Sequence, residues 1–164
     1  MNEKVKNELL RLIEKNSKIA VSELSKMLSV SEEEVLNELT KLEKENVICG
    51  YLTLIDWDKT EIDKVIGLIE VKVTPQRGEG FDRIAERIYN YKEVSSVYLI
   101  SGAYDLLVTL EESSLKDIAR FVSEKLSTLD TVLSTATHFI LKKYKDHGIV
   151  YSNKHEDNRE AFTL

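Results

Sequence analysis

A change in the spacing of hydrophobic residues near position 65 constrains this 164-residue chain more than any other feature. Over the first 50 residues the apolar side chains recur every three or four positions, which is typical of amphipathic helices. From there on they alternate: Ile69, Val71 and Val73 are separated by Glu70 and Lys72, as in a strand with one buried face. The sequence therefore predicts a helical N-terminal domain followed by a domain that contains a sheet.

The N-terminal domain is predicted to contain three short helices and a wing. The first helix carries its stripe at Val5, Leu9, Leu12 and Ile13, the second at Leu24, Met27 and Leu28, and the third at Val35, Leu39 and Leu42. Ser22 is a candidate N-cap for the second helix, while Ser31 and Glu34 have the spacing of a capping box for the third. Asn46 tolerates the left-handed conformation and ends the third helix. Residues 47–55 are rich in β-branched and aromatic side chains and predict a small strand or wing, which completes a winged helix-turn-helix.

The second domain is predicted to have the order β-α-β-β-α-β, which is the ferredoxin-like unit, so the fold class of the chain is α+β. Its two helices are marked by apolar residues every three or four positions, at 81–88 and 115–126, and its last strand carries Leu133, Thr135, Thr137, Phe139 and Leu141 on one side. The expected boundaries are residues 1–55 for the first domain, 56–64 for a linker, 65–144 for the second domain and 145–164 for a polar tail. The tail either docks as a short strand around Ile149 or stays mobile, and the sequence leaves both alternatives open.

The composition argues against membrane, disulfide and metal chemistry. No apolar run approaches the length of about 18 residues that a membrane span needs, and the first residues do not resemble an export signal, so we expect a cytoplasmic protein. The single cysteine, Cys49, has no partner for a disulfide or a zinc cluster. The histidines His138, His147 and His155 lack the i, i+4 spacing of two ligands on one helix. We expect no metal and no cofactor.

Two short motifs connect the chain to a known family. Residues 42–51, Leu-Glu-Lys-Glu-Asn-Val-Ile-Cys-Gly-Tyr, resemble an L-E-x-x-G-[VI]-I-x-x-Y/F segment, and residues 101–105, Ser-Gly-Ala-Tyr-Asp, resemble a [TS]-G-x-[YF]-D turn. Together with the order of elements, they are similar to the Lrp/AsnC family, the feast/famine transcriptional regulators. The resemblance implies an N-terminal domain that binds double-stranded promoter DNA and a C-terminal RAM-type domain that pairs its sheets into a homodimer. It also implies assembly to a tetramer or octamer in some members, and an amino acid or related metabolite as effector at the C-terminal interfaces.

The third helix has an unusual charge for a DNA-reading helix. The chain carries 23 Lys and Arg against 29 Asp and Glu, a net charge of −6, and residues 31–45 hold six acids against two lysines. Where family members often carry arginines on this helix, the sequence reads Asn37-Glu38-Leu39-Thr40-Lys41. Successive residues of a helix are rotated by about 100° around its axis. With this spacing, the face of the third helix that points away from the core has a net charge of +1. The predicted DNA-binding residues are Lys26, Ser31, Glu33, Asn37, Thr40, Lys41 and Lys44.

The turn from Ser101 to Asp105 is the predicted effector site. An amino acid needs backbone N–H donors for its carboxylate and an oxygen acceptor for its ammonium group, and a glycine turn beside an aspartate supplies both. The alternative is that Gly102 serves a tight connection and Asp105 caps it. The candidate residues are Ser101, Gly102, Ala103, Tyr104 and Asp105, with Thr135 and Thr137 of the last strand as additional hydroxyl donors.

Two other functions remain open at this point. One is a metabolite-sensing or oligomerisation module in which DNA binding is weak or lost. The other is an enzyme, since siroheme decarboxylases resemble the same two-domain architecture; their catalysis uses histidine and arginine, and the sparse histidines here provide no evident equivalent. We find no set of nucleophile, base and orienting residue, so the sequence favours a regulator that is not an enzyme.

Overall fold

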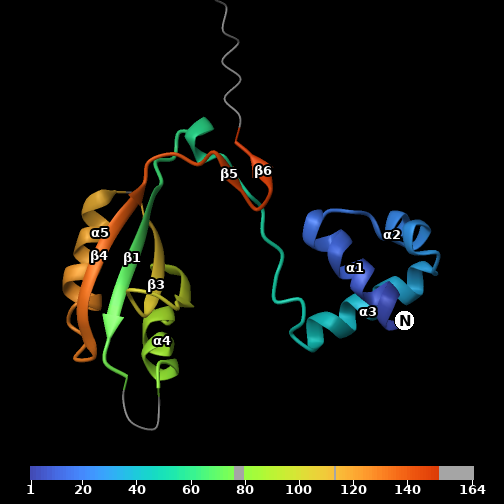
Figure 1. Cartoon of the computed structure of the whole chain (residues 1–164). Coiled ribbons are helices and arrows are strands. Elements are labelled where there is room, and N and C mark those ends of the chain that lie inside the picture. The colour runs from blue at the N-terminus through green and yellow to red at the C-terminus, as the bar shows by residue number, and fades with distance from the viewer. Residues whose placement is uncertain (76–79, 113, 152–164) are drawn as a thin grey trace, which may run out of the picture. The chain divides into compact units, whose positions relative to one another are not determined.

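The computed structural model describes residues 1–75, 80–112 and 114–151. The predicted tail beyond Tyr151, including His155, lies outside the described residues. The chain divides into two compact units, an N-terminal unit of Met1–Ile55 and a C-terminal unit that begins at Asp56. Figure 1 shows the elements of each unit, which are described separately below.

The N-terminal unit consists of three helices, as predicted, α1 (Glu3–Lys15), α2 (Val21–Leu28) and α3 (Glu32–Lys44) (Figure 1). The predicted apolar stripes meet in one core, except that Met27 is exposed. The buried members of this core are Leu9, Leu24, Leu28, Val35 and Leu42. The 3.6-residue period therefore placed both the helices and most of their inner faces correctly.

The ends of α3 are formed by the two residues that the sequence indicated. The side chain of Ser31 accepts a hydrogen bond from the backbone N–H of Glu34, whose carboxylate accepts one from the N–H of Ser31, so the predicted capping box is confirmed. At the other end Asn46 has a φ of 54°. This left-handed residue lets the N–H of Val47 bond the carbonyl of Leu42 at 2.9 Å, as in a Schellman motif.

Two predictions for the N-terminal unit are wrong. The N-cap of α2 is Ala20 and not Ser22, because the helix begins two residues earlier and the Ala20 carbonyl accepts the N–H of Leu24 at 3.0 Å. Residues 47–55 form no strand in the structure, so the wing is absent from the described residues. A strand needs a partner for its ladder, and this segment has none within the described chain; Leu52 is 91% exposed.

The C-terminal unit has the predicted β-α-β-β-α-β order, and a four-stranded antiparallel sheet in the order β2-β3-β1-β4. This is the ferredoxin-like arrangement, so the α+β prediction is confirmed. A single π-helical segment, Val122–Leu126, continues the second helix. The elements in Figure 1 are β1 (Val65–Val73), α4 (Asp82–Tyr89), β2 (Val94–Leu99), β3 (Leu106–Glu112), α5 (Leu115–Phe121) and β4 (Val132–Ile140).

The side chains of the central strand β1 alternate between the two faces of the sheet. Ile69 and Val71 are fully buried, and Val73 nearly so, against a core that includes residues of α4 and α5. The residues between them point to the other face, which no described helix covers. We call this surface the open face. Its members are Ile66, Leu68, Glu70 and Lys72 of β1, Ser96 and Tyr98 of β2, Leu107, Thr109 and Glu111 of β3, and Ser134, Ala136, His138 and Ile140 of β4.

Short elements flank the sheet. A 3₁₀ turn, η1 (Trp57–Lys59), precedes β1, and the Lys64 ammonium lies 4.3 Å from the centre of the Trp57 ring. Beyond β4, the strands β5 (Lys145–Asp146) and β6 (Ile149–Val150) form a hairpin from the beginning of the predicted tail. Among the described residues, no helix has the length and apolar character to cross a membrane.

The contact between β1 and α5 leads to a stability prediction. A Cβ added at Gly67 would lie 3.0 Å from Cγ2 of Ile118, a fully buried residue of α5. We expect Gly67→Ala to lower the free energy of unfolding by about 1–3 kcal/mol, because the packed helix must move to make room. Urea unfolding measures this change. The control is Gly102→Ala, whose added Cβ would meet its nearest neighbour at an ordinary 3.8 Å; equal losses in both variants would contradict the packing argument.

Candidate DNA interface and effector region

Helix α3 turns two chemically different faces to its surroundings. Its inner face holds Val35 and Leu42, which are buried in the core of the N-terminal unit. Its outer face is formed by side chains that are all exposed. These are five of the predicted DNA-binding residues, Glu33, Asn37, Thr40, Lys41 and Lys44. The outer face therefore offers two ammonium groups, an amide and a hydroxyl against one carboxylate, a composition suited to contacts with phosphates and base edges.

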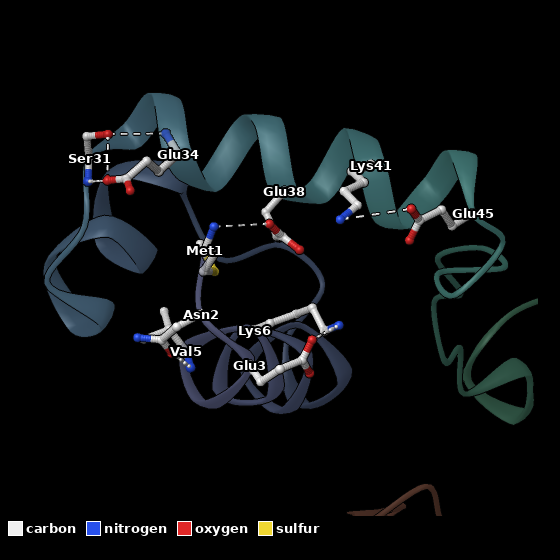
Figure 2. Close-up of polar contacts among 10 residues, drawn as sticks. All are labelled: Met1, Asn2, Glu3, Val5, Lys6, Ser31, Glu34, Glu38, Lys41 and Glu45. Atoms are coloured by element: carbon white, nitrogen blue, oxygen red, sulfur yellow. Dashed lines mark hydrogen bonds and ion pairs between the residues drawn. The ribbon is translucent and has the colours of Figure 1, made fainter.

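The two remaining candidates for DNA contact differ in availability. Lys26 lies on α2 and is exposed. Ser31 is exposed too, but its hydroxyl is engaged in the cap of α3, where it accepts from the N–H of Glu34 at 3.2 Å and donates to a carboxylate oxygen of the same residue at 3.1 Å. The observed role of the Ser31 hydroxyl is therefore to cap the start of α3. Of the two lysines on the outer face, Lys41 lies 4.0 Å from the carboxylate of Glu45, an exposed and hence weak ion pair (Figure 2).

Glu38 is one of the six acidic residues between positions 31 and 45, but it does not lie on the outer face of α3. It is buried between Val35 and Leu42 on the inner side, and its carboxylate lies 3.7 Å from the amino group of Met1 (Figure 2). The signal was present in the sequence, since Glu38 is three residues from Val35 and four from Leu42 and so shares their face. An ammonium partner offsets the cost of burying this carboxylate.

Two further acids of α3 are engaged with the protein itself. Hydrogen bonds from the backbone and side chain of Ser31 lower the pKa of Glu34, so the cap is present near neutral pH and is lost as the pH falls through that pKa. The carboxylate of Glu43 accepts a hydrogen bond of 2.7 Å from the hydroxyl of Tyr51. Glu43 and Tyr51 both belong to the family-like motif at residues 42–51. Their hydrogen bond connects the chain after α3 to the last turn of the helix.

The predicted effector turn lies between β2 and β3, and Asp105 anchors it to β1. The N–H of Asp105 donates to the carbonyl of Val71 at 3.1 Å, and its Oδ2 accepts from the N–H of Val73 at 2.8 Å. The carbonyl of Asp105 accepts from Ile100 at 2.8 Å. The alternative explanation, that Asp105 caps the turn, is therefore partly correct, because its carboxylate binds the backbone of β1. The bond uses one carboxylate oxygen and leaves the other for a ligand.

The rest of the turn is open to a ligand. Ser101, Gly102 and Ala103 are exposed and Tyr104 is half-buried. Gly102 is not among the described residues with positive φ, and a Cβ built on it would make only an ordinary contact. The backbone therefore does not require glycine at this position, which leaves close approach of another molecule as a reason for its small size.

Thr135 and Thr137 lie across β1 from the turn. They oppose Val71 and Ile69 in the register of β4 with β1, and they are half-buried on the helix-covered side. Asp105 binds the other edge of β1 at Val71. Thr135 is therefore level with the turn but separated from it by one strand, and Thr137 lies two residues further along β4, so one subunit does not join the hydroxyls and the turn into a single pocket.

A surface hollow of about 490 Å³ lies at the opposite end of the sheet, where β3 meets α5, and contains none of the predicted residues. Its charged groups bind one another: the Lys125 ammonium lies 2.5 Å from Glu93, and Arg120 pairs with Asp117. The Lys125 hydrogen bond lowers the pKa of Glu93, as expected for a stable ion pair. Within the described residues, no cluster of histidine, cysteine and carboxylate groups has the arrangement of a metal site.

Comparison with known proteins places these features in context. Residues 67–150 match the model of the Lrp/AsnC ligand binding domain. Over 153 residues the chain is 51% identical to the uncharacterized HTH-type transcriptional regulator YugG of Bacillus subtilis, an alignment that covers 93% of this chain and 92% of the relative. It is 27% identical over 142 residues to the proline dehydrogenase transcriptional activator of Rhizobium radiobacter, covering 87% and 90% of the two chains.

Solved structures share the fold. A transcriptional regulator of Neisseria meningitidis, determined in complex with L-Met, superposes with a TM-score of 0.70 at 20% identity, over 89% of this chain and 94% of that one. At this level of identity the likeness concerns the fold alone.

The cap of α3 yields a prediction that separates stability from recognition. Replacing Ser31 by Ala removes an acceptor for the N–H of Glu34, so we expect the N-terminal unit to lose about 1 kcal/mol of unfolding free energy. Thermal or urea unfolding followed by circular dichroism measures the loss. Ser22→Ala is the matched control: this serine does not cap α2, and we expect a change within about 0.5 kcal/mol. A larger loss at Ser22 than at Ser31 would contradict the assignment of the caps.

Proposed function

This chain belongs to the Lrp/AsnC family of transcriptional regulators, and from that premise we propose that it binds promoter DNA as a homodimer through α3 and responds to an amino acid at its C-terminal unit. Its relatives are named as HTH-type regulators, and we assign the chain a regulatory rather than a catalytic role in the cytoplasm, where such a protein meets its DNA. The observation that carries the proposal is the outer face of α3, which is exposed along its length and free of buried or structurally essential side chains apart from Ser31 at its start.

The charge of α3 is compatible with DNA binding once the acids are assigned. Glu38 is buried beside an amino group, Glu34 closes the cap and Glu43 binds Tyr51. The helix-turn-helix places the second of its helices, here α3, in the major groove, so Asn37 and Thr40 are in a position to contact bases, while Lys26, Lys41 and Lys44 meet phosphates. The acidic background makes the affinity modest and sensitive to salt.

The open face of the sheet supports the dimer. Its apolar members from β1, β3 and β4, Ile66, Leu68, Leu107 and Ile140, are partly exposed because the described part of the chain puts no helix over them. A sheet face that remains in water is normally polar, whereas this face mixes polar side chains with these four apolar ones. A second copy with the same face covers it by two-fold symmetry. Tetramers or octamers then need other surfaces of the unit.

The effector is proposed to bind at Ser101–Asp105. The turn exposes backbone around Gly102 for a carboxylate, and Asp105 keeps one carboxylate oxygen for an ammonium group. The relative from Neisseria meningitidis was determined with L-Met, which supports an amino acid as the class of ligand. Because β1 separates Thr135 and Thr137 from the turn, their hydroxyls complete a site only where another subunit approaches.

Charge reversal on α3 tests the DNA proposal. We expect Lys44→Glu to weaken binding to the fragment upstream of the protein's own gene by about tenfold or more near 100 mM salt, because it replaces a phosphate contact with repulsion. Fluorescence anisotropy measures the affinity. Lys15→Glu, an equal charge change at the exposed end of α1, is the control and should bind like the unaltered protein.

Each outcome of that experiment has a meaning. Equal affinities of Lys44→Glu and the unaltered protein would show that α3 does not read DNA. Absence of any complex of the unaltered protein at low salt would favour the alternative of a metabolite-sensing or oligomerisation module.

A variant of Asp105 tests the effector site. Asp105→Asn keeps an oxygen acceptor for the N–H of Val73 but loses the charge that attracts an ammonium group. We expect the unaltered protein to gain about 2.7 kcal/mol of stability when an effective amino acid is present at one hundred times its dissociation constant, and the variant to lose most of this gain. A thermal-shift screen of the common amino acids measures it. Asp58→Asn, which removes an exposed charge from the same unit, is the control; an undiminished shift in Asp105→Asn would exclude Asp105 from the site.

A further inference from the structure

The side chains of Glu70 and His138 meet in the middle of the open face. Nε2 of His138 lies 3.2 Å from Oε1 of Glu70, and the two side chains are 57% and 35% exposed. They come from neighbouring strands, since Glu70 opposes Ala136 and His138 opposes Leu68 in the pairing of β1 with β4. The pair therefore links two strands across a diagonal, and the residues opposite its two members, Ala136 and Leu68, are apolar.

The other titratable groups of the open face have different surroundings. Glu111 of β3 is bonded to Lys64 at 3.2 Å, outside the middle of the face. Lys72 of β1 is exposed toward the end of the strand, and Tyr98 of β2 is exposed as well. Within β4, His138 is the one titratable side chain. Among the ion pairs of the described residues, Glu70 has His138 as its partner.

Covering this face changes the energetic state of the pair. A carboxylate beside an imidazole without its second proton has a net charge of −1, and on an exposed face water solvates that charge at little cost. Between two packed sheets the same net charge loses its water, which is unfavourable, and Lys72 on the same face is not among the ion-pair partners described for Glu70. One added proton makes the pair neutral overall, whether the imidazole or the carboxylate holds it.

We propose that pairing of two copies through the open face takes up one proton per subunit at the Glu70–His138 pair, so that the dimer becomes tighter as the pH falls. The inference rests on the proposed homodimer and adds a regulation to it. Because the assembled state binds the proton more strongly, the stabilisation is complete at lower pH and is lost as the pH rises. Imidazole changes its charge between about pH 5 and 8, which places the effect in the physiological range.

The size of the effect follows from linkage. Two protons bound per dimer give at most two decades of change in the dissociation constant for each pH unit. We expect the constant to fall by about tenfold or more between pH 8 and pH 6, since the uptake is partial at both ends of this range. Glu70→Gln with His138→Gln, a double variant of similar shape, should dimerise with a change of no more than about twofold over the same range, because neither group titrates.

Sedimentation of the full chain, labelled with a fluorophore at its single cysteine, the exposed Cys49, measures the dissociation constant at nanomolar concentrations. Where the dimer is too tight to dilute apart, urea unfolding at several protein concentrations gives the same constant. His147→Asn is the matched control, because His147 is exposed on the β5–β6 turn with a φ of 43°, a conformation that asparagine tolerates. This variant should keep the full pH dependence.

The outcomes separate this inference from the proposed dimer. Leu68→Asp places a charge among the apolar residues of the open face and should produce a monomer; a dimer that survives it would show that the interface lies elsewhere, and both proposals fail. If Leu68→Asp is monomeric but the unaltered dimer does not tighten between pH 8 and pH 6, the interface stands and proton uptake is wrong. A pH dependence that persists in the double variant also overturns the inference, since a group other than Glu70 and His138 then binds the proton.

Discussion

The alternation of side chains along β1 is the constraint on which the C-terminal unit depends. Ile69, Val71 and Val73 are buried beneath the helices, while Leu68 and Glu70 face the other side. A slip by one residue would exchange these two sets, placing a carboxylate in the core and the β-branched residues on the surface. The strand therefore determines at once where the core lies and which residues form the open face.

Two local features hold β1 in this register. At its carboxyl end, Asp105 binds the backbone of Val71 through its N–H and that of Val73 through its side chain. Near its other end, the absence of a side chain at Gly67 lets Ile118 of α5 approach the strand closely. The proposed effector turn is thus attached to the strand that carries the proposed dimer surface, so a ligand that alters the turn would act on the end of β1. Such a ligand shifts the assembly only as far as it binds the two states with different affinity.

The sequence was sufficient for elements whose periodicity is strong and local. The alternating run at 69–73 and the capped stripe of α3 gave both the elements and their buried faces, because the pattern and the caps agree. The prediction of a wing at 47–55 was wrong. A high β propensity means that a residue fits well on a pleated sheet, and no described strand lies beside this segment to form a sheet with it. The sequence also could not predict that a strand separates Thr135 from Asp105. This separation arises because β1 lies between β3 and β4, and only the pairing of the strands in the folded sheet determines that order.

The net charge of −6 says less about the outer face of α3 once Glu34, Glu38 and Glu43 are seen to bind groups of the protein itself. Glu34 and Glu43 hold the two ends of the helix: one closes the cap with Ser31, and the other binds Tyr51 beyond the last turn. Hydrogen bonding to Glu43 raises the pKa of Tyr51, so the hydroxyl remains a donor throughout the physiological range. This bond spans eight residues and includes the left-handed Asn46 in the loop that it closes. The acidic residues that weaken the attraction of the helix for phosphate therefore also hold its two ends in place.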